Sequence, residues 1–232
     1  MRVWQENNRL VIGDGRYTLW LEPWGNNSFR VRMTGEAVMD GNDWALTEKV
    51  PECVPEISYE EVDTTDPWYK GDEYRKYHQT GRIYTMRNGK ITAKISPEGW
   101  ISYYNQSGEL LTEEYWRNRN RINRYCVPIR VDARELKPIP GSTDYELTAR
   151  FEAFDDEKIF GMGQYQEKHL DKKGATLELA HRNSQASVPF MVSSRGYGFF
   201  WNNPAIVIFR YIFHYLNCRK PFVRLWISSL TD

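Results

Sequence analysis

The 232-residue sequence has few cysteines, no excess charge of either sign and no long apolar run, and each absence excludes a class of protein. Cys53, Cys126 and Cys218 are too few and too scattered for a disulfide framework or a zinc site. Lys and Arg total 31, as do Asp and Glu, so no basic field is present to attract a nucleic acid. No stretch approaches the ~18–20 apolar residues of a membrane-spanning helix, and the N-terminal MRVWQENNRL lacks the pattern of a signal peptide. We therefore expect a cytoplasmic globular protein with no nucleic-acid or membrane partner.

What the sequence does contain is a series of short alternating runs separated by turn residues. In Phe29 to Met33, apolar residues alternate with Arg30 and Arg32, which is typical of a half-buried strand. Similar runs are Arg16 to Leu21, Lys90 to Ile95, Trp100 to Tyr104, Leu110-Leu111 and Tyr145 to Phe151. Turn residues recur about every ten residues, and neither a βαβ rhythm nor a convincing amphipathic helix is present. The pattern predicts an all-β fold, an antiparallel β-sandwich.

Two stretches do not fit the strand pattern. Thr64 to Thr80 is polar and charged, and we interpret it as a surface loop. The arginine-rich stretch from Glu113 to Arg124 is interpreted as a solvated edge or loop rather than a binding patch, because acidic residues adjoin it and the whole chain is neutral.

The region from Lys158 onward is rich in glycine. Gly161 and Gly163 suggest a dinucleotide loop, but no third glycine opening a helix follows, so no cofactor is predicted. Beside Phe160, this glycine pair instead predicts a β-bulge or a close backbone crossing. The alternating aromatics Tyr197, Phe199 and Trp201 could stack on a sugar ring, but aromatics in this pattern usually lie in a core.

Several separate motifs in this region resemble glycoside hydrolase family 31, the α-glucosidases and α-xylosidases. The matching pieces are Phe160-Gly161-Met162-Gly163-Gln164, Leu170 to Gly174, Arg182-Asn183, Val188-Pro189-Phe190, Ser193 to Phe199 and Trp201 to Pro204, with Glu22 to Asn26 and Phe29 to Arg32 upstream. Their order and spacing make the resemblance specific over roughly residues 3 to 206. The resemblance implies the N-terminal β-sandwich of these enzymes, which is similar in fold to galactose mutarotase.

The resemblance also implies a catalytic partner. Retaining cleavage of an α-glycosidic bond needs two carboxyl groups about 5 Å apart, and in this family both lie in a (β/α)₈ barrel that follows the sandwich. The Trp-x-Asp-Met-Asn-Glu stretch of that barrel is absent, and only 28 residues follow Pro204. No residue here matches the nucleophile or the acid/base, so we expect no catalytic residues in this chain and no activity of its own.

Family members use a loop of the sandwich to contact sugar hydroxyls at the barrel mouth. The matching positions are Arg182, Asn183, Ser184 and Gln185, from which we take Arg182, Asn183 and Gln185 as candidate substrate-binding residues. An ordinary surface loop is the alternative, and Asn183 stands where many relatives carry an acid. His169 and His181 flank the loop without further ligands at fixed spacing, so no metal site is predicted.

The last 26 residues differ from the rest. Residues 207–232 contain no glycine and four basic residues against one acid, and the family resemblance stops abruptly before them. We divide the chain into a sandwich, 1–206, and an atypical C-terminal tail, 207–232, that arose by a frameshift or premature stop or belongs to a genuine short variant.

Three functions fit these observations. The first is the substrate-shaping, carbohydrate-binding N-terminal domain of an α-glycosidase acting on α-glucosides or α-xylosides. The second is a stand-alone, non-catalytic carbohydrate-binding module that binds through exposed Trp or Tyr faces. The third is an assembly in which a separate polypeptide supplies the barrel.

Overall fold

The alternating runs fold into β-strands that pair throughout as antiparallel neighbours. The computed structural model describes residues 2–15, 17–39, 41, 53–63, 81–115, 133–142, 144–152, 154–203, 207–210, 215–219 and 222–229. Within these ranges there are eighteen strands and no helix, so the predicted all-β fold is confirmed.

The strands are numbered in the order in which they follow one another along the chain. The first nine are β1 (Arg2–Glu6), β2 (Arg9–Asp14), β3 (Tyr17–Pro23), β4 (Ser28–Thr34), β5 (Glu56–Val62), β6 (Gly81–Asn88), β7 (Ile91–Ile95), β8 (Ile101–Tyr104) and β9 (Leu110–Glu113). The remaining nine are β10 (Arg134–Pro138), β11 (Tyr145–Arg150), β12 (Ile159–Gln164), β13 (Thr176–Leu179), β14 (Ala186–Ser193), β15 (Tyr197–Trp201), β16 (Val207–Arg210), β17 (Tyr215–Arg219) and β18 (Phe222–Ser229).

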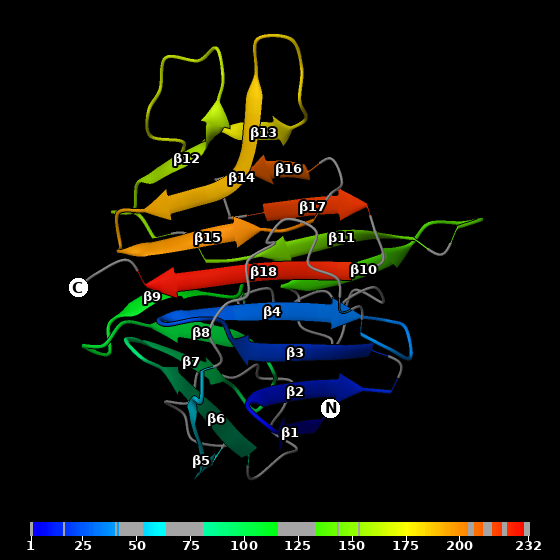
Figure 1. The fold of residues 1–232 in the computed structure, drawn as a ribbon, viewed down its shortest axis with the longest axis vertical. Helices are drawn as coiled ribbons and strands as arrows, with labels where there is room; N and C mark the ends of the chain where they lie inside the picture. Colours follow the sequence, from blue (N-terminus) through cyan, green and yellow to red (C-terminus); the bar gives the residue numbers. More distant parts are fainter. Residues whose placement is uncertain are drawn as a thin grey trace.

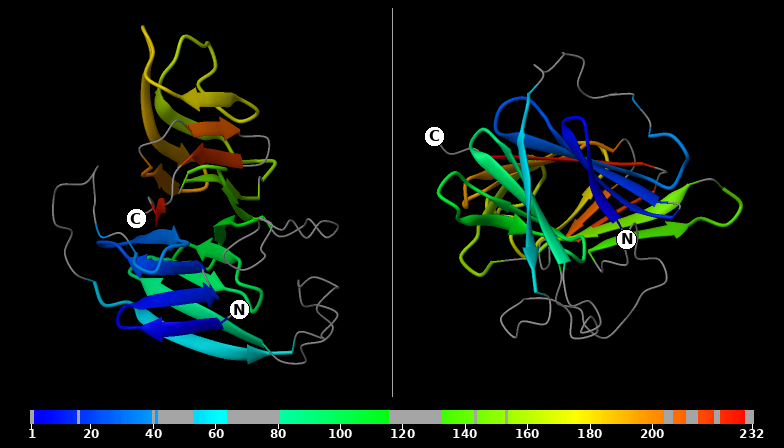
Figure 2. Two further views of the ribbon diagram at one scale, coloured as in Figure 1. Left: turned by 90° about the vertical axis from the view of Figure 1, so that its right-hand side faces the viewer. Right: turned by 90° about the horizontal axis from the view of Figure 1, so that it is seen from below.

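Three sheets make two layers. An eight-stranded sheet has the order β1-β2-β3-β4-β18-β15-β14-β12 and forms the front layer in Figure 1. Two five-stranded sheets, β5-β6-β7-β8-β9 and β10-β11-β17-β16-β13, lie behind its lower and upper halves, as the side view in Figure 2 shows. An isolated bridge between Glu114 and Phe151 joins the two smaller sheets into one back layer.

The core lies between the layers and is formed by the apolar positions that the alternation predicted. On β3 and β4, Leu19, Leu21 and Phe29 are at most 1% exposed. From the back layer, Ile95 on β7 and Leu147 on β11 are buried to the same degree. Each fully buried side chain of this size is worth about 1.5–3 kcal/mol, so burial between the layers is the main force that holds them together.

The opposite face of β4 is more buried than the alternation suggested. Arg30 and Arg32 are only 8% and 6% exposed, so β4 is covered on both faces rather than half-buried. The carboxylate of Glu22 accepts hydrogen bonds from Nε of Arg30 (3.2 Å) and Nε of Arg32 (2.8 Å). The guanidinium of Arg30 also stacks on Trp24, 3.8 Å from the ring centroid. Paired and stacked in this way, the arginines can be buried at low cost.

Residues 207–232 contribute three strands. β16 pairs with β13 and β17, and β17 pairs with β11. β18 lies between β4 and β15, where Leu225 is opposite both Val31 and Trp201, and it appears as the red arrow near the middle of Figure 1. The backbone pairing thus places these strands inside both layers, while the predicted domain boundary after residue 206 stays a prediction.

The back layer also holds a buried ion pair. Glu114 and Arg134 are 6% and 4% exposed and are joined by a salt bridge, and the Glu114 carboxylate accepts a further hydrogen bond from the Ile101 amide at 2.7 Å.

The predicted loop at 64–80 and most of the arginine-rich stretch, 116–124, lie outside the described residues. In the part of the chain that the structure describes, no helix is long and apolar enough to cross a membrane.

Candidate functional site

The candidate site begins at a break in β12, at the upper end of the molecule in Figure 1. Gly161, Met162 and Gly163 have φ of 97°, 69° and 105°, and the pairing of β12 with β14 shifts register between the two glycines. The predicted bulge at this glycine pair is confirmed. The bulge buries the Met162 side chain in the core. It also bends the strand and so changes the direction of the chain beyond it.

Neither glycine leaves room for a side chain. A Cβ on Gly163 would lie 2.1 Å from the carbonyl oxygen of Ala186, and one on Gly161 would lie 2.7 Å from that of Phe190. The backbones of β12 and β14 therefore approach closely here. This approach fixes the direction in which β14 leaves the sheet, and so sets where its N-terminal end lies.

Beyond the bulge, β13 and β14 belong to different sheets and are joined by a loop that an isolated bridge between Arg182 and Gln185 folds back on itself (Figure 1). We call this loop the hairpin, and its tip carries the predicted substrate-binding residues. The amide of Gln185 donates a hydrogen bond to the carbonyl of Arg182 at 3.0 Å, with Asn183 and Ser184 as the turn residues between them. Ser184 has a φ of 65°, in the left-handed region that such turns use. The structure thus brings Arg182, Asn183 and Gln185 together at one tip. Their role in binding stays a prediction.

The tip is exposed to solvent, and its arginine, Arg182, forms a salt bridge with Glu178 on β13. The side chains of Arg182 and Glu178 are 62% and 44% exposed and form a salt bridge. Asn183 is also exposed, and Gln185 is half-buried. An exposed pair of this kind stabilises the fold by at most about 1 kcal/mol, but it restricts where the guanidinium points.

The base of the hairpin is braced by hydroxyl groups. The Tyr165 hydroxyl and Ser187 Oγ are 2.9 Å apart, and Ser187 Oγ lies 3.4 Å from the carbonyl oxygen of Ala180. Partial burial raises the pKa of Tyr165. The brace connects the loop after β12 to both ends of the hairpin.

The loop from β12 to β13 is held by its own set of hydrogen bonds. Lys172 is 7% exposed, and its ammonium donates to a Glu167 oxygen and to the carbonyl of His169 at 2.8 Å. The Asp171 carboxylate accepts hydrogen bonds from the amides of Ile159 and Lys173, both at 3.0 Å. Burial works against the charged form of Asp171, but these amides and the charges of Lys158 and Lys173 together outweigh it and lower the pKa of the carboxyl. The loop beside the hairpin is therefore internally fixed.

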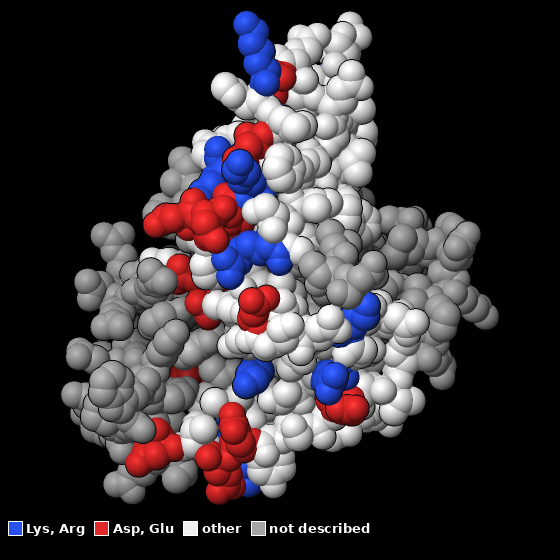
Figure 3. Space-filling model, turned by 90° about the vertical axis from the view of Figure 1, so that its left-hand side faces the viewer, with Lys and Arg blue, Asp and Glu red and all other residues white. Residues whose placement is uncertain are grey.

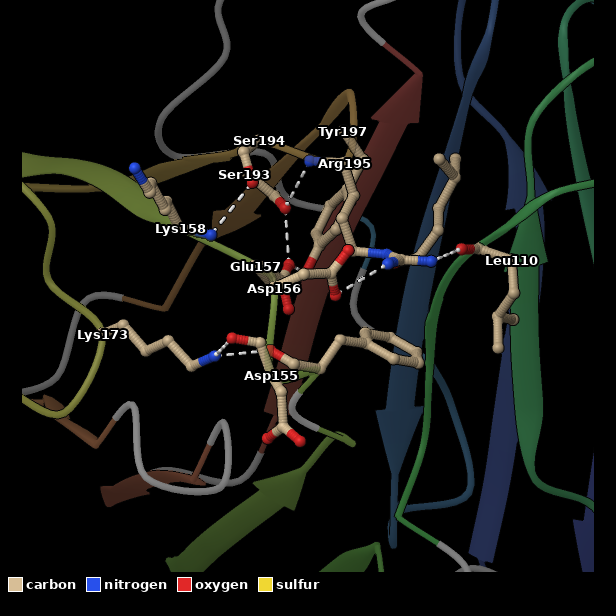
Figure 4. Close-up of polar contacts among 12 residues, drawn as sticks. Leu110, Asp155, Asp156, Glu157, Lys158, Lys173, Ser193, Ser194, Arg195 and Tyr197 are labelled. Atoms are coloured by element: carbon tan, nitrogen blue, oxygen red, sulfur yellow. Dashed lines mark hydrogen bonds and ion pairs between the residues drawn. The ribbon is translucent and has the colours of Figure 1, made fainter.

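The motif from Ser193 to Tyr197 surrounds a buried carboxylate, shown in Figure 4. Glu157 is 2% exposed and accepts hydrogen bonds from the Ser193 hydroxyl and from the Tyr197 hydroxyl, the latter at 2.7 Å. Burial and the adjacent Glu157 charge raise the pKa of Tyr197 well above its ordinary value. The motif thus has a structural role, since its contacts with Glu157 hold the turn from β14 to β15.

Arg195 extends this turn to the back layer. Its guanidinium donates to the carbonyl of Leu110 on β9 at 2.6 Å and pairs with Asp156 at 3.4 Å (Figure 4). It also stacks on the Phe154 ring, 4.1 Å from the ring centroid. Along this edge, acidic and basic side chains lie next to one another in Figure 3. The contacts pin the eight-stranded sheet to the β5–β9 sheet.

The other residues considered from the sequence take structural places. Tyr197, Phe199 and Trp201 are at most 2% exposed, which confirms the core interpretation over sugar stacking. His169 and His181 are exposed. Among the described residues, no three His, Cys, Asp or Glu side chains gather as a metal site would require.

Sequence reasoning missed the residues that brace the hairpin, the loop beside it and the turn from β14 to β15. Tyr165, Lys172 and Glu157 act through partners that are 5 to 40 positions away along the chain. No local pattern indicates such pairs. The available signal was a charged or hydroxyl side chain inside an otherwise apolar stretch, and many exposed residues give the same signal.

The arrangement offers hydrogen-bonding groups for a neutral polar ligand. A guanidinium, an amide and a second amide at one exposed tip can donate to and accept from adjacent hydroxyl groups. The bridge at the tip, the salt bridge to Glu178 and the hydroxyl contact at the base restrict the spacing of these groups, and preorganisation of this kind reduces the entropy lost on binding.

Comparison with known proteins places this fold in a family. The family model described as "Glycosyl hydrolase 31 N-terminal galactose mutarotase-like domain" matches residues 18–209. A crystal structure of an α-xylosidase of the same family from a soil metagenome, complexed with xylose, is 40% identical with a TM-score of 0.79. It covers 99% of this chain, which covers 32% of that protein.

Curated relatives agree and are much longer. The uncharacterized family 31 glucosidase ORF2 of Pseudescherichia vulneris is 44% identical over 200 residues, covering 82% of this chain and 34% of the relative. Alpha-xylosidase A of Aspergillus niger is 29% identical over 213 residues, covering 84% of this chain and 25% of the relative. The chain thus spans about a third or less of the length of these relatives.

Proposed function

The chain belongs to glycoside hydrolase family 31 and forms its N-terminal galactose mutarotase-like domain, and from this premise we propose that it is the substrate-shaping, carbohydrate-binding domain of an α-glycosidase. The hairpin tip of Arg182, Asn183 and Gln185 contacts hydroxyl groups of an α-glucoside or α-xyloside. The observation that carries the proposal is the braced, exposed hairpin that presents all three side chains at one point.

We assign hydrolysis itself to the part of the longer relatives that lies outside the segment matched by this chain. Retaining hydrolysis requires two carboxyl groups about 5 Å apart on either side of the scissile bond. Nothing at the hairpin tip supplies such a pair, since residues 180–185 contain no Asp or Glu and the nearby Glu178, on β13, is bound to Arg182. The domain therefore acts by positioning substrate over a catalytic (β/α)₈ barrel and is inactive alone. Its cytoplasmic location, expected from the sequence, stays a prediction.

The expected contribution of the hairpin to substrate binding can be stated as a free energy. A hydrogen bond to an uncharged partner is worth about 0.5–1.5 kcal/mol, and one to a charged group about 1.5–3 kcal/mol. Loss of the Arg182 contact should thus weaken substrate binding by roughly ten- to a hundredfold if the guanidinium is desolvated in the complex. It should weaken binding by about two- to tenfold if the site stays wet.

A chimera tests the proposal. The whole chain, residues 1–232, replaces the matched N-terminal segment of the 40%-identical α-xylosidase, and KM and kcat are measured for an aryl α-xyloside and a xylose-containing oligosaccharide. We expect R182A and Q185A to raise KM for the oligosaccharide. The matched control is R82A, which removes another exposed arginine that is paired with a glutamate (Arg82–Glu61, 3.1 Å) on β6. Equal KM values for R182A and R82A would contradict the proposal.

A further inference from the structure

A second surface of the domain presents an aromatic ring to solvent. In the part of the chain that the structure describes, the exposed large apolar side chains include two aromatics, Trp4 (41%) and Tyr59 (55%). The Tyr59 ring already has the Arg82 guanidinium 4.5 Å from its centroid and the Tyr84 ring 5.7 Å away. Trp4 has no such ring or cation contact among the described residues, so its ring is the one open to a ligand.

Trp4 leans across the neighbouring strand. It lies on the edge strand β1 opposite Val11 of β2. A Cβ on Gly13 would be 2.8 Å from Cη2 and 3.0 Å from Cζ3 of the indole, so the far edge of the ring rests over this glycine. The ring therefore lies along the sheet instead of standing upright, which turns a face outward.

Gly13 is required by the tryptophan and not by the backbone. Its φ is outside the left-handed region, so any residue could adopt its backbone conformation. A side chain there would displace the indole. Val11, opposite both Trp4 and Trp20, is only 1% exposed, which shows that the aromatic side chains cover this part of the outer face. The sequence thus keeps a ring in place that is still 41% exposed.

Polar side chains flank the ring. Because side chains alternate along a strand, Arg2, Trp4 and Glu6 share one face of β1, and both Arg2 and Glu6 are exposed. Glu6 is held by Arg9 at 2.8 Å. An aromatic face carries partial negative charge, which attracts the slightly positive C–H bonds on the face of a pyranose ring, while the charged neighbours can bond its hydroxyl groups.

We propose that Trp4, supported by Gly13, is a stacking site for a pyranose ring of a neutral oligosaccharide. The ligand class rests on the proposed function of the domain. The site itself is separate from the hairpin, since β1 lies at the lower end of the molecule and the β13–β14 hairpin at the upper end (Figure 1). The domain would then hold a glycan at two places.

Titration of the full chain with isomaltotriose and with xylose, followed by NMR, tests this site. We expect W4A to weaken binding of at least one of these probes by about two- to tenfold, the range given by an aromatic contact of 0.5–1.5 kcal/mol. G13A should weaken it as well, because the added methyl group displaces the ring. The control Y59A removes the other exposed aromatic and should leave the affinity unchanged.

The two proposals fail separately. R182A reports on the hairpin, so a loss with R182A but not with W4A would overturn the Trp4 site and leave the proposed function standing. Unchanged binding by W4A, or binding of neither sugar at millimolar concentration, also overturns it. If W4A instead changes the oligomeric state measured by light scattering, the exposed ring serves a second copy of the chain, and the proposal is wrong.

Discussion

Replacing Gly163 with alanine should destabilise the domain more than the same change at any open glycine. Gly163 has a φ of 105°, and its added Cβ would lie 2.1 Å from the Ala186 carbonyl oxygen and 2.8 Å from the Val188 amide nitrogen. The strained backbone costs about 1–3 kcal/mol, and overpacking typically costs about 1–3 kcal/mol. We expect the free energy of unfolding to fall by roughly 2–6 kcal/mol, the sum of the two.

The control separates these two contributions. Gly174 also has a positive φ (83°), but a Cβ there would meet nothing within 4 Å. G174A therefore carries the backbone cost alone, about 1–3 kcal/mol. For a chain of this size, 1 kcal/mol corresponds to about 2–4 °C in Tm, so G163A should melt several degrees below G174A.

Urea unfolding followed by tryptophan fluorescence measures both variants, and hydrogen exchange shows where the damage lies. In G163A, the amides of the hairpin and of β14 should lose protection first, because the close approach of β12 and β14 is what positions them. Equal stability of G163A and G174A would refute the argument that the glycine is kept for close backbone contact.

Three further predictions follow from other contacts. Cutting the chain after residue 206 should lower Tm by many degrees, because it removes the strand between β4 and β15; higher solubility with unchanged Tm would instead support an unselected tail. The lowered pKa of Asp171 means that its stabilisation is present above the unfolded pKa of about 3.9 and is lost as pH falls through the folded value, so the Tm difference between the chain and D171N should shrink below pH ~4. R195A should speed exchange of the β9 amides, since its guanidinium holds the carbonyls of Leu110 and Leu111; R82A is the control, and equal exchange would contradict the link.

The sequence predicted the strands well where one face is apolar and the other polar. The run from Tyr145 to Phe151 and the run from Phe29 to Met33 appear as β11 and β4 within one or two residues of their expected limits. The glycine pair at 161 and 163 predicted the bulge, because glycine inside a strand often marks a bulge or a close approach of another backbone.

Burial and partnership were harder to predict. Arg30 and Arg32 were expected on an open face, and are buried because Glu22 and Trp20 on β3 and Trp24 just after it cover them. Such cover depends on which strands become neighbours, and alternation within one strand does not reveal this. The family resemblance, in contrast, placed Arg182, Asn183 and Gln185 on one loop, and they do share the tip of one hairpin.

The central claim is that this chain positions substrate without cleaving it. Its most direct test is release of nitrophenol from aryl α-glucosides and aryl α-xylosides by the purified chain, expressed in a host that lacks its own α-glycosidases. The account predicts no release above that of a mock purification, because both carboxylates of the retaining pair are assigned to the barrel. Turnover that rises in proportion to the concentration of this chain would contradict it.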